Sequence, residues 1–118
     1  MPYVAIKTDY VMENIDVEEL NKKICAQLNV PQTKVQLSWE MFHEGNYYSH
    51  RKKPEHGEIQ RPIVEITLSK RNSEEFKRSL VLAVAEQTGL ILGLEKEDFL
   101  VLVYYLEEGN IYLDGEFV

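Results

Sequence analysis

The residue with the clearest chemical potential in this sequence is Pro2, which follows Met1 and heads the apolar run at 3–6. If Met1 is removed, the ring nitrogen of Pro2 becomes a free secondary amine. An α-amine titrates near ~8, and an apolar, desolvated setting lowers the pKa of a cationic group. A neutral amine at physiological pH can act as a general base. An ordinary N-terminus is the competing interpretation, so the rest of the chain has to decide between the two.

The other reactive residue types form no comparable pattern. His43, His50 and His56 are not spaced like metal ligands on one helix face, and no cysteine or paired carboxylate joins them. We therefore expect no metal site and no cofactor. The single cysteine, Cys25, cannot form an internal disulfide, which fits a reducing compartment. We expect Cys25 to be a buried, inert thiol.

Composition narrows the class of protein. The chain has 118 residues, of which 44% are hydrophobic and 28% charged, as is typical of one soluble globular domain over 1–118. The net charge of −7 argues against nucleic acid and anionic membranes as partners. No apolar run is long enough to cross a bilayer, and Lys7 and Asp9 interrupt the N-terminal run too early for a signal peptide. We expect a cytoplasmic protein.

The elements that must position Pro2 come from a unit that occurs twice. The segment 2–6 (PYVAI) recurs as 62–66 (PIVEI), and both read as strands. A second strand is predicted in each unit. Residues 35–39 alternate apolar and polar side chains, whereas 99–104 is continuously apolar and is predicted to be buried on both faces.

A helix start signal lies between the strands of each unit. The signals are Asp16-x-x-Glu19 and Asn72-x-x-Glu75, both of which fit a capping box. Apolar spacing predicts a first helix over 17–28 and a second that ends at Leu92, with Gly93 as its left-handed cap. Gly89 should weaken the last turn of the second helix.

Both units also end alike. Gly45-Asn46 and Gly109-Asn110 are turn pairs, each expected to lead into a short edge strand, and Asp114-Gly115 predicts a further turn. The pseudo-repeats span 2–48 and 62–118, joined by a polar linker, 49–61. The linker carries the basic run 51–53, which is either a solvated loop or a set of cations that fold over a site.

These patterns predict an α+β fold with a duplicated βαβ unit: a four-stranded mixed sheet, two helices on one face and short edge strands. The other sheet face should remain bare, with residues such as Val101 and Val103 on it. A bare apolar face of this size favours a partner subunit.

The N-terminal proline, the duplicated βαβ unit and the chain length resemble the tautomerase superfamily, in particular the macrophage migration inhibitory factor type. Residues 40–47 (EMFHEGNY) resemble the ending of 4-oxalocrotonate tautomerase, and the segments 62–66 and 70–75 (KRNSEE) resemble its opening. The ending 112–115 (YLDG) is similar to that of a group of small bacterial proteins with this fold. The resemblance implies a homotrimer with no cofactor.

The resemblance also implies site residues. Pro2 matches the catalytic proline, which moves a proton in an enol or 2-keto acid, and Arg71 matches an arginine that binds the substrate carboxylate. Tyr47 falls at an aromatic position near the site, and Lys70 adds positive potential beside Arg71. The sequence departs from the polar site residues of these enzymes at three positions: at Val30, at Val35 or Gln36 depending on the gap in the alignment, and at Val101.

Two functions are therefore open. The first is a tautomerase or isomerase that acts on a small carboxylate through Pro2. The second is a non-catalytic trimeric small-molecule-binding or scaffold protein that keeps the fold, as the three valines suggest.

Overall fold

A computed structural model describes residues 2–9, 15–43, 45–49 and 60–118 of the chain. The basic run 51–53, His50, His56 and most of the linker 49–61 lie outside these residues. The elements in chain order are β1 (Tyr3–Thr8), α1 (Val17–Leu28), the 3-10 turn η1 (Gln32–Lys34), β2 (Gln36–Met41), β3 (Ile63–Ser69), α2 (Glu74–Leu92), the 3-10 turn η3 (Lys96–Asp98), β4 (Leu100–Leu106), β5 (Tyr112–Leu113) and β6 (Glu116–Phe117).

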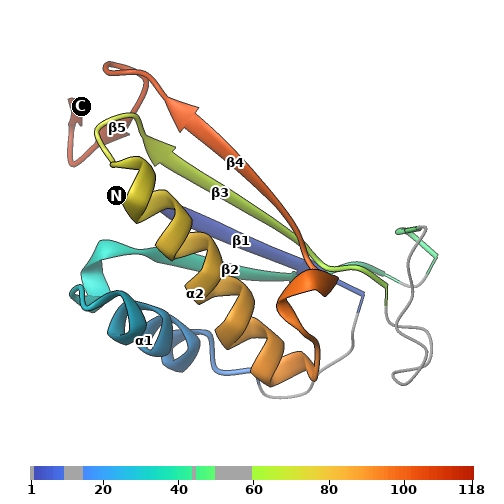
Figure 1. The fold of residues 1–118 in the computed structure, drawn as a ribbon. Helices are drawn as coiled ribbons and strands as arrows, with labels where there is room; N and C mark the ends of the chain where they lie inside the picture. The colour runs from blue at the N-terminus through green and yellow to red at the C-terminus, as the bar shows by residue number, and fades with distance from the viewer. Residues whose placement is uncertain (1, 10–14, 44, 50–59) are drawn as a thin grey trace.

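The first four strands form one mixed sheet in the order β2-β1-β3-β4. β1 pairs in parallel with β2, and β3 pairs in parallel with β4, while β1 and β3 meet antiparallel at the centre. Figure 1 shows α1 and α2 side by side on one face of this sheet. The predicted duplicated βαβ fold is confirmed.

The core lies between the sheet and the helices. Alternate residues of each central strand point toward the helices and are fully buried, as Val4 and Ile6 are in β1 and Val64 and Ile66 in β3. Leu20 and Ile24 of α1 and Leu80 and Val84 of α2 cover them. Each such side chain contributes about 1.5–3 kcal/mol when it leaves water, so this layer holds both units together.

The helix ends agree with the sequence in three of four cases. Asp16 caps α1 through a 2.9 Å bond from the Glu19 backbone N–H, and Gly93 ends α2 with a φ of 70°. The predicted cap of α2 at Asn72 is wrong: Ser73 caps the helix, since its hydroxyl accepts the backbone N–H of Phe76 at 3.0 Å. The Asn72 amide donates instead to the carbonyl of Ser69. The Asn-Ser pair offers two capping side chains, and the β3–α2 turn selects the second.

The sheet face opposite the helices is open in the single chain, and two predictions about β4 need correction. β4 is not buried on both faces, because the helices cover only one side of the sheet. Val101 and Val103, which were predicted to lie on the bare face, point instead to the covered side and pack against the core. Leu100, Leu102 and Tyr104 are on the open face, where they are 37%, 38% and 47% exposed.

The C-terminal turns form as predicted, with one exception in the first unit. Asp114 and Gly115 take φ values of 54° and 84°, the left-handed pair that a tight hairpin between β5 and β6 requires. Gly45 and Gly109 are left-handed as well. The edge strand expected after Gly45-Asn46 is absent, because residues 47–49 pack through side chains and do not pair with a strand. No helix in the described ranges has the length and apolar character needed to span a bilayer.

Candidate functional site

Pro2 lies at the head of β1, at the end of the sheet where β2 begins and β3 ends. Its carbonyl accepts the backbone N–H of Gln36 at 3.0 Å, and the next residue, Tyr3, pairs with both Gln36 and Thr67. Continuing the antiparallel register places Pro2 opposite Leu68. Pro2 is buried.

A hollow of about 240 Å³ opens at the same end of the sheet. Three segments that are distant in sequence form its walls: η1, the turn between β3 and α2, and the C-terminal hairpin. The lining residues are Lys34, Ser69, Arg71, Asn72, Ile111 and Val118. Figure 1 shows the N-terminus, the start of α2 and β5 gathered at this end. Among the described residues that line the hollow, Lys34 and Arg71 carry cationic side chains, and none of the lining side chains is a carboxylate.

Carboxylates of the same chain neutralise the two cations that the sequence singled out. Arg71 binds Glu108 through Nη2 at 2.9 Å and Nε at 3.1 Å, with both donors on the same oxygen, Oε1. Its neighbour Lys70 pairs with Glu107, and Lys70 is absent from the lining of the hollow. The turn after β4 therefore compensates the positive charge of the β3–α2 turn.

Lys34 is the functional candidate that the sequence analysis missed. It lies at the end of η1, two residues before the strand residue whose N–H binds Pro2, and it lines the hollow. Its Nζ lies 5.6 Å from the centroid of the Phe76 ring, a cation–π contact. The sequence did place Lys34 directly before the predicted strand 35–39, at the end of the sheet where Pro2 lies. An exposed lysine, however, has no distinguishing pattern in sequence.

Tyr47 lies at the opposite end of the sheet from Pro2. Its hydroxyl donates to the carbonyl of Arg61 at 2.6 Å, and its ring stacks on Phe42, with ring centroids 4.6 Å apart. Phe42 in turn binds the last residue of β1, Thr8. The length of β1 puts about 20 Å between Tyr47 and Pro2 in one chain. Burial raises the pKa of Tyr47, which keeps its hydroxyl protonated. Tyr47 can reach a Pro2 site only from another copy of the chain.

Val30, Val35 and Val101, which stand where the resemblance would place polar site residues, pack inward. Val35 is 3% exposed and belongs to the core, and Val30 and Val101 are partly buried against it. None of them lines the hollow beside Pro2, and neither does Pro2 itself. Cys25 is buried as expected, and desolvation raises its pKa, so its thiol stays protonated.

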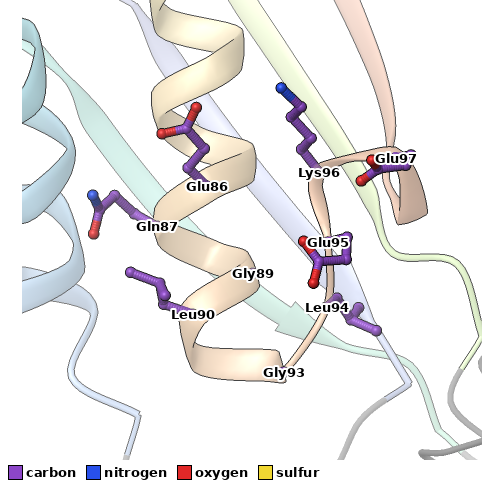
Figure 2. A pocket seen from close by; sticks show the side chains of 9 residues that line it. All are labelled: Glu86, Gln87, Gly89, Leu90, Gly93, Leu94, Glu95, Lys96 and Glu97. Atoms are coloured by element: carbon purple, nitrogen blue, oxygen red, sulfur yellow. The ribbon is translucent and has the colours of Figure 1, made fainter.

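A larger hollow, of about 630 Å³, lies at the other end of α2 (Figure 2). Glu86, Glu95, Lys96 and Glu97 line it beside the exposed Leu90. Three carboxylates and one amine make this hollow unsuited to a carboxylate ligand. The hollow with Lys34 and Arg71 is therefore the candidate site.

No protein-family model matches the chain, and no curated protein matches it. Solved structures match it over almost its whole length. A native fused 4-OT has a TM-score of 0.74 at 13% identity, with 98% of this chain and 94% of the other covered. A member of the cis-3-chloroacrylic acid dehalogenase family has a TM-score of 0.72 at 15% identity, with 98% and 82% covered.

A macrophage migration inhibitory factor-like protein from Entamoeba histolytica has a TM-score of 0.67 at 11% identity, with 99% of this chain and 98% of the other covered. Matches of this extent show that the chain has the tautomerase fold of the macrophage migration inhibitory factor type, as the sequence resemblance implied.

Proposed function

We propose that this chain, which has the tautomerase fold, is a tautomerase or isomerase that moves a proton within a small enol or 2-keto acid. Pro2 is the general base, once removal of Met1 exposes its amine. The observation that carries the proposal is the position of Pro2: it is buried at the head of β1, at the sheet end where a hollow lined by two cations opens.

The chemistry requires a neutral base and a bound anion. The amine takes a proton from the enol hydroxyl or from the carbon next to the ketone, and it returns the proton to the other atom. The resemblance makes Arg71 the candidate for binding the substrate carboxylate and Lys70 a neighbouring cation, although Glu108 and Glu107 pair with them within the single chain. Backbone N–H groups or a cation must stabilise the charge on the enolate oxygen, because valines replace the polar residues at 30, 35 and 101.

Three chains complete the site in this proposal. Fused 4-OT proteins of similar structure form symmetric and asymmetric trimers. The open sheet face of this chain offers Leu100, Leu102 and Tyr104 to a neighbour, which could bring its Tyr47 toward Pro2.

The first experiment determines whether the base exists. Intact-mass analysis of the native protein should show that Met1 is absent. The trimmed protein should then ketonise the monocarboxylate phenylenolpyruvate, and the Pro2→Ala variant should lose about 10²-fold or more in kcat/KM. A form of the same protein that retains Met1 is the matched control, because its Pro2 nitrogen is an amide. Equal turnover by all three forms would refute the proposal.

An acetylenic 2-keto acid gives an independent test. A structurally similar protein, Pt0534, is inactivated by 2-oxo-3-pentynoate. The trimmed chain should gain the mass of one reagent, located at Pro2 by peptide mapping, whereas the form that retains Met1 should not. Modification at another residue, or none, would count against a nucleophilic amine at Pro2.

A non-catalytic binding protein is the second candidate, favoured by the inward packing of Val30, Val35 and Val101. In that case carboxylates would raise the melting temperature without any turnover.

A further inference from the structure

We propose that Lys34, and not Arg71, is the residue that binds the carboxylate of the ligand, and that the site therefore selects monocarboxylates over dicarboxylates. The proposal deepens the proposed function, since it concerns the same hollow, but it is tested by binding alone and does not need turnover.

Arg71 is already engaged by a carboxylate of its own chain. Its Nε and Nη2 both donate to Oε1 of Glu108, at 3.1 Å and 2.9 Å. A ligand carboxylate at the remaining N–H donors of Arg71 would lie beside the negative charge of Glu108, which repels it. Glu107 compensates Lys70 in the same way on the adjacent residue. The net charge that these four side chains present to an anion is zero.

Lys34 has no such partner among the residues that the structure describes. Its Nζ lies 5.6 Å from the centroid of the Phe76 ring, a contact that leaves its N–H donors available. The other polar residues of the wall do not compete for it. The Asn72 amide donates to the Ser69 carbonyl, and the Ser69 hydroxyl accepts the N–H of Arg71.

The ligand class follows from size and charge. The hollow, about 240 Å³, lies below the ~300–1,000 Å³ that is common for drug-sized ligands, which fits a small acid. One uncompensated cation matches one carboxylate. A second carboxylate would meet the Arg71–Glu108 pair, where Glu108 repels it. Glu108 is thus a specificity-determining residue and Lys34 an anion-binding residue.

The test uses a matched pair of probes, crotonate and fumarate. Crotonate carries a methyl group where fumarate carries its second carboxylate. Titration calorimetry on the protein from which Met1 has been removed should show tighter binding of crotonate than of fumarate. Lys34→Gln should weaken crotonate binding by about tenfold to a hundredfold, the usual effect of a lost hydrogen bond to a charged group. Lys34→Arg should restore most of it. Lys23→Gln, on the exposed face of α1, is the control and should bind as the wild type does.

The second half of the test is a gain of binding. Glu108→Gln releases Arg71 and should strengthen fumarate binding about tenfold or more while crotonate binding changes little. Arg71→Gln in that background should remove the gain. The inference is overturned if Lys34→Gln binds crotonate normally, if Arg71→Gln alone abolishes crotonate binding, or if the wild type binds neither probe. Loss of binding in Lys34→Gln without any turnover in the wild type would support the inference and refute only the proposed enzyme activity.

Discussion

Gly89 lies near the end of α2, where the chain leaves the helix and turns back across it. The N–H of Leu94 donates to the Gly89 carbonyl at 3.0 Å, and Gly93 provides the left-handed cap. A Cβ on Gly89 would lie 2.5 Å from the Leu94 carbonyl oxygen. The glycine is required by this close approach of backbone to helix, although in isolation it costs the helix about 1 kcal/mol relative to alanine.

Gly89→Ala should therefore lower the free energy of unfolding by about 1–3 kcal/mol, because the overpacking outweighs the gain in helix propensity. Urea unfolding followed by circular dichroism measures the effect. Glu86→Ala, an exposed site on the same helix, should change stability by no more than about 0.5 kcal/mol. A stabilised Gly89→Ala protein would show that the turn around Leu94 can move without cost.

At the scale of elements, the start of α2 decides where Arg71 and Asn72 point. Ser73 caps the helix, so the residues before it belong to the turn that follows β3. In that turn the Asn72 side chain binds Ser69, and Arg71 reaches Glu108. A cap at Asn72 would instead have turned the Asn72 side chain toward the helix N-terminus and away from the Ser69 carbonyl that it binds.

Ser73→Ala should reduce stability by about 1 kcal/mol, since the Phe76 N–H loses its acceptor at the helix N-terminus. Thermal or urea unfolding provides the measurement. Ser79→Ala is the matched control: Ser79 is an exposed residue inside the same helix, where alanine is the better helix former. If both variants had the same stability, Ser73 would not be the cap.

At the scale of the whole molecule, the dominant feature is a sheet with helices on one face only. The other face presents Leu100, Leu102 and Tyr104 beside Tyr3, all of them more than a third exposed in the single chain. Apolar patches of this kind mark interfaces. A second chain on this face would bury β4 on both sides, which its continuously apolar sequence suggested.

Leu102→Lys should disrupt this interface, because a lysine at the centre of β4 would be buried without a partner. Sedimentation velocity should show a trimer for the wild type and a monomer for the variant. Leu90→Lys is the control: Leu90 is 78% exposed but lies on α2, away from the sheet face, and its variant should stay trimeric. A monomeric wild type, or a trimeric Leu102→Lys variant, would exclude this face as the interface.

The sequence by itself determined the duplicated architecture, the bounds of α1, the left-handed cap at Gly93 and the Asp114-Gly115 hairpin. These features depend on neighbours within a few residues or on apolar periodicity, and both are visible in one dimension. It also placed Pro2 at the head of a buried strand, for the same reason.

Only the tertiary structure decided which side chains share a site with that end of the sheet. The register of β1 against β2 and β3 brings η1 and the β3–α2 turn together, so Lys34 lines the hollow while Tyr47 lies at the far end. The pairing of Arg71 with Glu108 joins residues from opposite ends of the second unit. Such contacts depend on distances between strands, which residue types and spacings do not encode locally.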